Sequence, residues 1–190
     1  MNSSYVLGIC GHAGAGKDMV ADYLVKELGF VRMALADPIK EIAHIYFHVP
    51  MDQLQRSNKP EKVRRLLQQL GTEVGRAFNT NIWTETLCHR IQGSTEPRIV
   101  ITDVRFPNEA GMLIQECNAD LILIRRPLNP NKGSEMMQHA SETSIEKIPF
   151  DQFRAAFLNI EDKKDELIDD VLVNVKGWLE CHSNSQKTPE

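Results

Sequence analysis

A glycine-rich stretch close to the amino terminus carries the residues best suited to chemistry. It matches the phosphate-loop pattern G-x-x-x-x-G-K at every fixed position before the last. Glycines let the backbone turn its N–H groups toward a phosphate, and the lysine reaches the β- and γ-phosphates. The stretch therefore predicts binding of a nucleoside triphosphate by Gly11, His12, Ala13, Gly14, Ala15, Gly16, Lys17 and Asp18.

Asp18 departs from this pattern, which usually has Ser or Thr at its last position. The usual hydroxyl ligates Mg²⁺, and a carboxylate can also hold this ion. An acid in the first turn of a helix also stabilises the helix dipole without any metal. Both readings of Asp18 stay open at this point.

A second candidate for chemistry is an apolar run that ends in an acid. Residues 99–102 are mainly β-branched and Asp103 follows them, which is the form of a Walker B strand. We therefore expect Asp103 to lie near Mg²⁺ or substrate. Arg105 follows at the carboxyl end of the same strand, where open α/β sheets bind their ligands.

Hydrophobic periodicity predicts the elements that position these residues. Strands alternate with helices, so we expect an α/β fold of three layers, a parallel sheet flanked by helices, as in P-loop NTPases. A β–α–β unit over residues 98–125 supports the parallel arrangement. The predicted strands are 5–10, 30–34, 98–103, 119–125 and 155–160, and the predicted helices are 17–28, 38–47, 61–78, 82–91, 108–117 and 165–181.

The chain length favours one domain with internal divisions. It has 190 residues, of which 42% are hydrophobic and 25% charged, as in ordinary globular proteins. The predicted core comprises residues 1–37, 94–126 and 150–182. A helical insert occupies 38–93, a proline-containing polar insert 127–149, and a polar tail 183–190.

Charge and cysteine usage exclude several classes of function. A formal net charge of −4 lacks the positive field that binds polymeric nucleic acid. No apolar stretch approaches the roughly 20 residues that span a bilayer, so we expect a soluble cytoplasmic protein. The four cysteines form no C-x-x-C pair, which argues against a zinc ribbon and favours packed, reduced thiols.

A core with two inserts resembles the nucleoside monophosphate kinase group, and three segments resemble bacteriophage-type deoxynucleoside monophosphate kinases more closely. These segments are 11–18 with its Gly-Lys-Asp ending, 65–76 and 101–109. The resemblance implies transfer of the γ-phosphoryl group of ATP to a deoxynucleoside 5′-monophosphate. It also implies Mg²⁺, an acceptor-binding role for insert 38–93, a lid at 127–149, and the host cytoplasm as location if the chain is phage-encoded.

The resemblance also gives roles to individual residues. Phosphoryl transfer depends on positioning and on positive charge around the nonbridging oxygens, so converging arginines are expected. Lys17, Asp103, Arg105 and Arg126 are the predicted catalytic residues, Arg125 joins the ATP site, and Asp18 and Asp103 are the predicted metal ligands. The predicted acceptor site comprises Asp37, Lys40, Arg65, Gln68, Thr72, Glu73, Arg76, Trp83, Asp103 and Arg105.

Two alternative functions remain at this stage. Another small-molecule P-loop kinase, similar to dephospho-coenzyme A kinase or phosphomevalonate kinase, would share the phosphate loop, although segment 65–76 argues against it. A non-catalytic nucleotide-binding switch is motivated by Asp18. The accepted bases, the selection of deoxyribose and a homodimeric state stay open.

Overall fold

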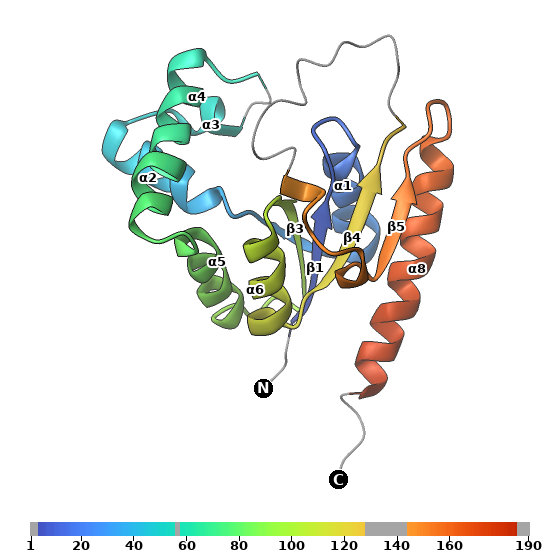
Figure 1. Ribbon diagram of the computed structural model, residues 1–190. Coiled ribbons are helices and arrows are strands. Elements are labelled where there is room, and N and C mark those ends of the chain that lie inside the picture. Colours follow the sequence, from blue (N-terminus) through green and yellow to red (C-terminus); the bar gives the residue numbers. More distant parts are fainter. Residues whose placement is uncertain (1–3, 56–57, 128–143, 186–190) are drawn as a thin grey trace.

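The computed structural model describes residues 4–55, 58–127 and 144–185, built around a five-stranded sheet (Figure 1). All strand pairings are parallel, and the strand order is β2-β3-β1-β4-β5. The strands are β1 (Tyr5–Cys10), β2 (Val31–Met33), β3 (Arg98–Val104), β4 (Asp120–Arg125) and β5 (Ala155–Leu158). The predicted parallel α/β sheet is confirmed, and the carboxyl ends of all five strands meet at one edge.

Helices cover both faces of the sheet and make three layers. Helices α1 (Lys17–Leu28) and α8 (Lys164–Ser185) pack on one face, and α5 (Ile82–Gln92) and α6 (Pro107–Cys117) pack on the other. Alternation along β1 explains this division, because Leu7 and Ile9 point into the first layer whereas Val6 and Cys10 point into the second. The phosphate loop thus follows a strand that is buried on both faces.

The first part of the predicted helical insert packs around a small core of its own, whereas α5, also within residues 38–93, packs on the sheet. It contains α2 (Asp37–Phe47), α3 (Met51–Gln55), α4 (Glu61–Gln68) and a π helix, η1 (Gln69–Arg76). Ala43, Leu54 and Val63 form its buried centre. Helix α3 was not predicted, and the single helix expected over 61–78 is divided between α4 and η1.

Close packing of Trp83 against two glycines accompanies the π helix. The indole Nε1 of Trp83 donates a hydrogen bond to the backbone oxygen of Gly71 at 2.8 Å. Gly75 faces the same ring, and a Cβ at this position would collide with it. A side chain at residue 75 would therefore push η1 away from α5.

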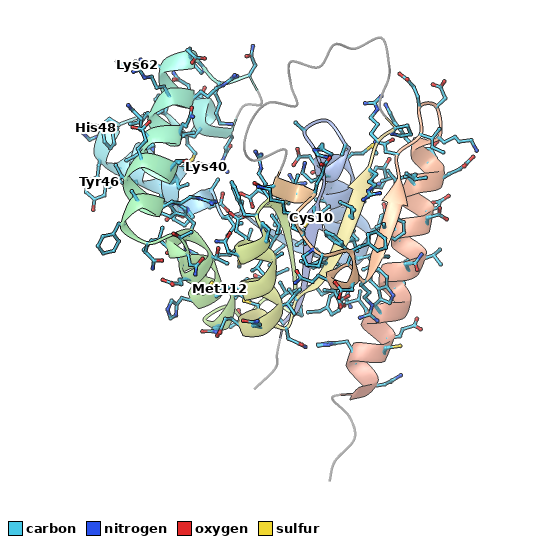
Figure 2. The ribbon with its side chains drawn as sticks, viewed as in Figure 1. Cys10, Lys40, Tyr46, His48, Lys62 and Met112 are labelled. Carbon is cyan, nitrogen blue, oxygen red and sulfur yellow. The ribbon has the colours of Figure 1, made fainter. Side chains whose placement is uncertain are left out.

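The cysteines are free, as expected, and their surroundings differ. Cys10 and Cys88 are buried, Cys117 is half-buried and Cys181 is exposed. Cys10 ends β1, the middle strand of the sheet (Figure 2), and burial there raises the pKa of its thiol to about 12. The interior thiol is therefore protonated at neutral pH.

Two boundaries differ from those expected. Helix α8 continues to Ser185, so the predicted polar tail begins inside a helix, and residues 186–190 lie outside the described part of the chain. Most of the predicted lid, residues 128–143, also lies outside it. Ile145 and Ile148, at the end of that segment, are buried in the layer that contains α5 and α6. None of the described helices has the length and apolar character needed to cross a membrane.

Candidate active site

The phosphate loop lies between β1 and α1, at the carboxyl edge of the sheet. The Nζ atom of Lys17 donates to the backbone oxygens of Gly11 at 2.6 Å and His12 at 2.9 Å. Gly14 and Gly16 have φ angles of 74° and 102°, which L-residues rarely adopt. The lysine ammonium thus lies against the loop backbone, at the amino-terminal end of α1 where an anion is stabilised.

Asn159, directly after β5, holds this loop from the side. Its side chain is buried, and Nδ2 donates to the backbone oxygen of Ala15 at 2.8 Å. Its backbone N–H donates to the oxygen of Arg125 at 2.7 Å, which ties β5 to β4. A Cβ on Gly16 would lie 2.5 Å from the Asn159 amide nitrogen. Asn159 was not among the predicted site residues, although its place at the carboxyl end of a strand could have indicated it.

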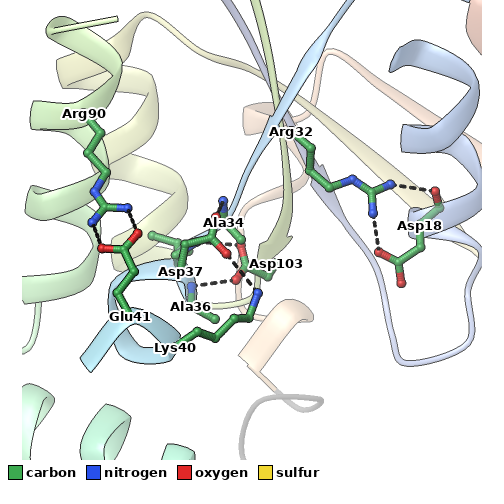
Figure 3. Close-up of polar contacts among 10 residues, drawn as sticks. Asp18, Arg32, Ala34, Ala36, Asp37, Lys40, Glu41, Arg90 and Asp103 are labelled. Carbon is green, nitrogen blue, oxygen red and sulfur yellow. Dashed lines mark hydrogen bonds and ion pairs between the residues drawn. The ribbon is translucent and has the colours of Figure 1, made fainter. Parts of the chain in front are cut away.

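Asp103, at the carboxyl end of β3, anchors the chain between β2 and α2. Its two carboxylate oxygens accept hydrogen bonds from the backbone N–H groups of Leu35 at 2.9 Å and Ala36 at 3.0 Å (Figure 3). Burial raises the pKa of this carboxyl, although the two N–H donors and Arg105 oppose the shift. Asp103 therefore fixes the entry into the helical insert.

Lys40 and Asp37 form an ion pair beside this anchor. Lys40 Nζ lies 2.9 Å from Asp37 Oδ1, and Asp37 Oδ2 accepts from the backbone N–H of Ala34 at 2.8 Å (Figure 3). The structure thus brings together three residues of the predicted acceptor site, with Asp103 as the third. They come from β3 and the first turn of α2.

Arg76 reaches from η1 to the first turn of α6. Its guanidinium pairs with the buried carboxylate of Glu109 and lies 4.2 Å from the centre of the Phe106 ring. The other Glu109 oxygen accepts from the backbone N–H groups of Arg105 at 2.8 Å and Phe106 at 3.0 Å. Glu109 caps α6, and burial raises the pKa of its carboxyl. The insert is thereby connected to the segment that carries Arg105.

Asp18 lies exposed in the first turn of α1 and faces Arg32 from β2. Their Oδ1 and Nη1 atoms are 3.6 Å apart (Figure 3). Arg32 also pairs with Asp22 at 3.0 Å. Within the described ranges, no group of three or more His, Cys, Asp or Glu side chains is placed to hold a metal ion.

Known proteins are similar to this chain in sequence. The family model for deoxynucleotide monophosphate kinase matches residues 50–153. A protein of Acanthamoeba polyphaga mimivirus, whose name assigns it to the deoxynucleotide monophosphate kinases, is 31% identical over 144 residues, covering 64% of this chain and 74% of its own. The chain belongs to the deoxynucleotide monophosphate kinase family. Membership confirms the predicted kinase and implies ATP as the phosphoryl donor.

A phage protein is similar to this chain in sequence, and two solved structures are similar to it in fold. The deoxynucleoside-5′-monophosphate kinase of Escherichia phage T5 is 38% identical over 86 residues, which cover 43% of this chain but 34% of the phage protein. In fold, the chain is similar to TT1252 from Thermus thermophilus, with a TM-score of 0.56 and 16% identity over 93% of this chain and 98% of that one. A shikimate kinase from Acinetobacter baumannii gives 0.53, with 11% identity over 93% and 95% of the two chains.

Several residues predicted to bind the acceptor of this deoxynucleotide monophosphate kinase are exposed on the insert. They are Arg65 and Gln68 on α4, and Thr72 and Glu73 on η1. Trp83 differs from them, because its ring is buried against Gly75. This packing makes Trp83 a support for η1 and leaves base stacking to other groups.

The arginines predicted beside the lid lie at the end of β4. Arg125 is exposed, with its guanidinium 5.9 Å from the centre of the Phe150 ring, and Arg126 Nη2 lies 3.6 Å from Glu161 Oε1. His12 of the phosphate loop lies 3.8 Å from Glu146. These groups belong to the same edge of the sheet as Lys17, whereas Tyr46 and His48 lie on the far side of the insert (Figure 2).

Proposed function

We propose that the chain transfers the γ-phosphoryl group of ATP to the 5′-phosphate of a deoxynucleoside monophosphate. The observation that carries this proposal is the position of Lys17. Its ammonium lies against the phosphate loop, at the sheet edge where β3 ends between Asp103 and Arg105. A phosphoryl donor bound to the loop would thus lie next to the helical insert, whose entry segment is held by Asp103.

The donor side uses the loop backbone and Lys17. The ammonium now donates to two loop carbonyls, and a bound phosphate offers it stronger, charged acceptors. Positive charge held at this position stabilises the oxygens of the transferring group as its bonds rearrange. Asn159 holds Ala15 and thereby keeps the loop in shape for this contact.

Mg²⁺ fits beside the loop with Asp18 as the protein ligand. Mg²⁺ sites in kinases combine one or two carboxylates with substrate phosphates and water, so no three-residue cluster is required. Asp18 offers an exposed carboxylate immediately after Lys17. Asp103 fits less well, because its two oxygens hold the backbone N–H groups of Leu35 and Ala36. An Mg²⁺ ion bound by Asp18 would neutralise phosphate charge.

The acceptor side is the helical insert with the residues that follow β3. Arg105 is exposed at the sheet edge, and its backbone N–H is fixed by Glu109. We assign it to the acceptor phosphate, where a guanidinium can bind two oxygens at once. Lys40 and Asp37 face the same edge, and the exposed polar residues of α4 and η1 are assigned to the sugar and base. Arg76 positions this surface through Glu109.

The extent of the family match supports this choice of acceptor over that of other P-loop kinases. The matched residues, 50–153, include α4, η1 and β3 and do not include the phosphate loop, which P-loop enzymes of many functions share. We assign Arg125 and Arg126 to the donor side because they end β4 beside the loop. The proposed division is a core, an acceptor insert at 38–93 and a lid at 127–149. We place the reaction in the cytoplasm, where both nucleotides are dissolved.

A coupled assay of diphosphate formation tests the proposal. ATP and Mg²⁺ are supplied with each of the four common deoxynucleoside monophosphates and their ribonucleoside counterparts. We expect turnover with at least one deoxynucleotide, and a loss of about 100-fold or more in kcat for Lys17→Ala. Lys26→Ala, an exposed lysine of the same helix, is the matched control and should retain activity. Absence of turnover with every acceptor, or normal kcat in Lys17→Ala, would refute the proposal.

A further inference from the structure

Two thiols meet between α5 and α6, on the face of the sheet opposite α1 and α8. The Sγ atom of Cys117 donates a hydrogen bond to the Sγ atom of Cys88 at 3.0 Å. Cys88 lies within α5, Cys117 is the last residue of α6, and both are reduced. The proposed phosphoryl transfer uses neither of them, so this contact between sulfurs has no role assigned to it.

Packing of the two helices holds these thiols together. Helices α5 and α6 lie side by side (Figure 1), and Leu87 and Leu113 belong to the hydrophobic cluster that they share with the sheet. At the amino-terminal ends of the helices, Asn108 Nδ2 donates to Asn81 Oδ1 at 2.8 Å. The helices are therefore joined at one end by two amides and further along by two thiols.

The distance between the sulfurs suits a covalent bond between them. A disulfide is about 2.05 Å long, so the two Sγ atoms would approach each other by roughly 1 Å from their separation of 3.0 Å. Rotation of the two side chains can supply such a movement. In the part of the chain that the structure describes, no third His, Cys, Asp or Glu is placed to complete a metal site with these sulfurs. The pair is thus a dithiol.

The two sulfurs differ in access and in acidity. Cys88 is buried and Cys117 is half-buried, so a reagent in solution reaches Cys117 first. The hydrogen bond between the thiols lowers the pKa of Cys88, although burial and the carboxylates of Glu116 and Glu85 oppose this shift. The same bond raises the pKa of Cys117. The pair therefore loses a first proton more readily than a second, and a thiolate is the species that attacks a disulfide.

We propose that Cys88 and Cys117 are a redox-active dithiol, which a low-molecular-weight disulfide converts to an intramolecular disulfide between α5 and α6. The Cys117 sulfur attacks one sulfur of the reagent, which breaks the S–S bond of the reagent and releases a first small thiol. The Cys88 sulfur then attacks Cys117 and releases the second small thiol. Two electrons pass from the protein to the reagent, and the two protons of the dithiol end on the released thiols.

The bridge would cross-link the helices that support the acceptor side of the candidate active site. It closes a loop that contains β3 with Asp103, and α5 also carries Trp83, which packs against η1. In a reducing compartment such a pair stays reduced, so the bridge forms when the ratio of small disulfide to small thiol rises. The proposal depends on the contact between the thiols and is independent of the kinase activity.

Equilibration of the folded chain with oxidised and reduced glutathione at several ratios tests the proposal. The exposed thiol of Cys181 is removed by Cys181→Ser, so that it forms no adducts. After free thiols are blocked, mass spectrometry should show a chain that has lost two hydrogens, carries no glutathione and joins Cys88 to Cys117. The Tm should rise by about 5–10 °C, because closing a loop across 29 residues restricts the unfolded chain. Dithiothreitol should reverse both changes.

Two further variants show whether this pair is responsible. Cys88→Ser and Cys117→Ser, each combined with Cys181→Ser, should form no bridge, and their Tm should not respond to the glutathione ratio. Cys117→Ser alters a half-buried position at the end of α6, so it retains the fold if the buried Cys88→Ser does not. A lasting glutathione adduct at Cys117, a bridge that forms only in urea, or no reaction at any ratio would overturn the proposal. A bridged chain with the Tm of the reduced chain would do the same.

Discussion

The side-chain amide of Asn159 donates a hydrogen bond to the backbone oxygen of Ala15, across a sequence separation of 144 residues. This bond joins the end of β5 to the middle of the phosphate loop. Because the Asn159 backbone N–H also holds the oxygen of Arg125, one buried residue connects the loop to two strands. The loop is thus supported by the last strand of the sheet as well as by β1 and α1, which flank it in sequence.

Replacing Asn159 should impair both stability and catalysis. Asn159→Ala removes a buried hydrogen bond, so we expect a loss of about 1–3 kcal/mol in the free energy of unfolding. It should also lower kcat, because the loop carbonyl of Ala15 is no longer held. Urea unfolding and steady-state kinetics measure the two effects. Asn174→Ala, an exposed residue of α8 that also bonds to a backbone oxygen, should change neither, and equal losses in both variants would contradict the role given to Asn159.

Gly75 should not tolerate a side chain. A Cβ at this position collides with the Trp83 ring, so Gly75→Ala should lower the free energy of unfolding by about 1–3 kcal/mol through overpacking. Gly111→Ala provides the comparison, since a Cβ there meets nothing within 4 Å on α6. That substitution should stabilise the helix by roughly 0.5–1 kcal/mol. A Tm for Gly75→Ala at or above that of the parent would disprove the close contact.

Replacing Arg76 should reduce the stability of the fold more than it reduces substrate binding. Arg76→Ala leaves the buried Glu109 carboxylate without its cation, and breaking such a pair destabilises a fold by about 3–5 kcal/mol when both groups are fully buried. Because Arg76 is partly exposed, we expect the lower end of that range. Thermal unfolding tests this, with the exposed Arg64→Ala on α4 as control. A large rise in KM for the acceptor without a change in Tm would make Arg76 a direct ligand instead.

Glu109 should make the folded state less stable as pH rises. Burial raises the pKa of its carboxyl in the folded chain, so between about pH 4.3, the value for an unfolded Glu, and the folded pKa the folded state binds more protons than the unfolded state. In that window the contribution of Glu109 to the free energy of unfolding falls with increasing pH. Urea unfolding at several pH values should show a weaker fall for Glu109→Gln. The exposed Glu116→Gln should leave the parent slope unchanged, and an unchanged slope in Glu109→Gln would exclude this contribution.

Local patterns in the sequence predict the framework of the fold and the nucleotide loop. Apolar runs gave the five strands within a few residues, because strands buried on both faces require continuous hydrophobic stretches. Gly29, which directly follows the predicted helix 17–28, ends α1 in the left-handed conformation. The loop itself was evident because its glycines and lysine have fixed spacing.

Local sequence patterns did not predict the contacts between segments that are distant in the chain. Asp103 was expected near Mg²⁺ or substrate, and no local pattern indicated that its carboxylate also accepts hydrogen bonds from two backbone N–H groups that come 68 and 67 residues earlier in the chain. Trp83 was predicted in the acceptor site, and its ring is packed against Gly75 of η1. Neither a π helix nor the partner of a buried Asn159 has a periodic signature, so both depend on tertiary contacts.

The π helix η1 accommodates one extra residue without changing the alignment of the helices on either side of it. A helix that closes its hydrogen bonds over five residues instead of four holds one residue more in a turn. In η1 that arrangement lets Gly71 and Gly75 meet the same indole while Arg76 extends toward α6. A relative that lacks one residue between 69 and 76 can return to an ordinary α-helix with its flanking helices still aligned. Sequence alignments across this segment should therefore match the residue that faces Trp83 and allow a gap of one residue between 69 and 76.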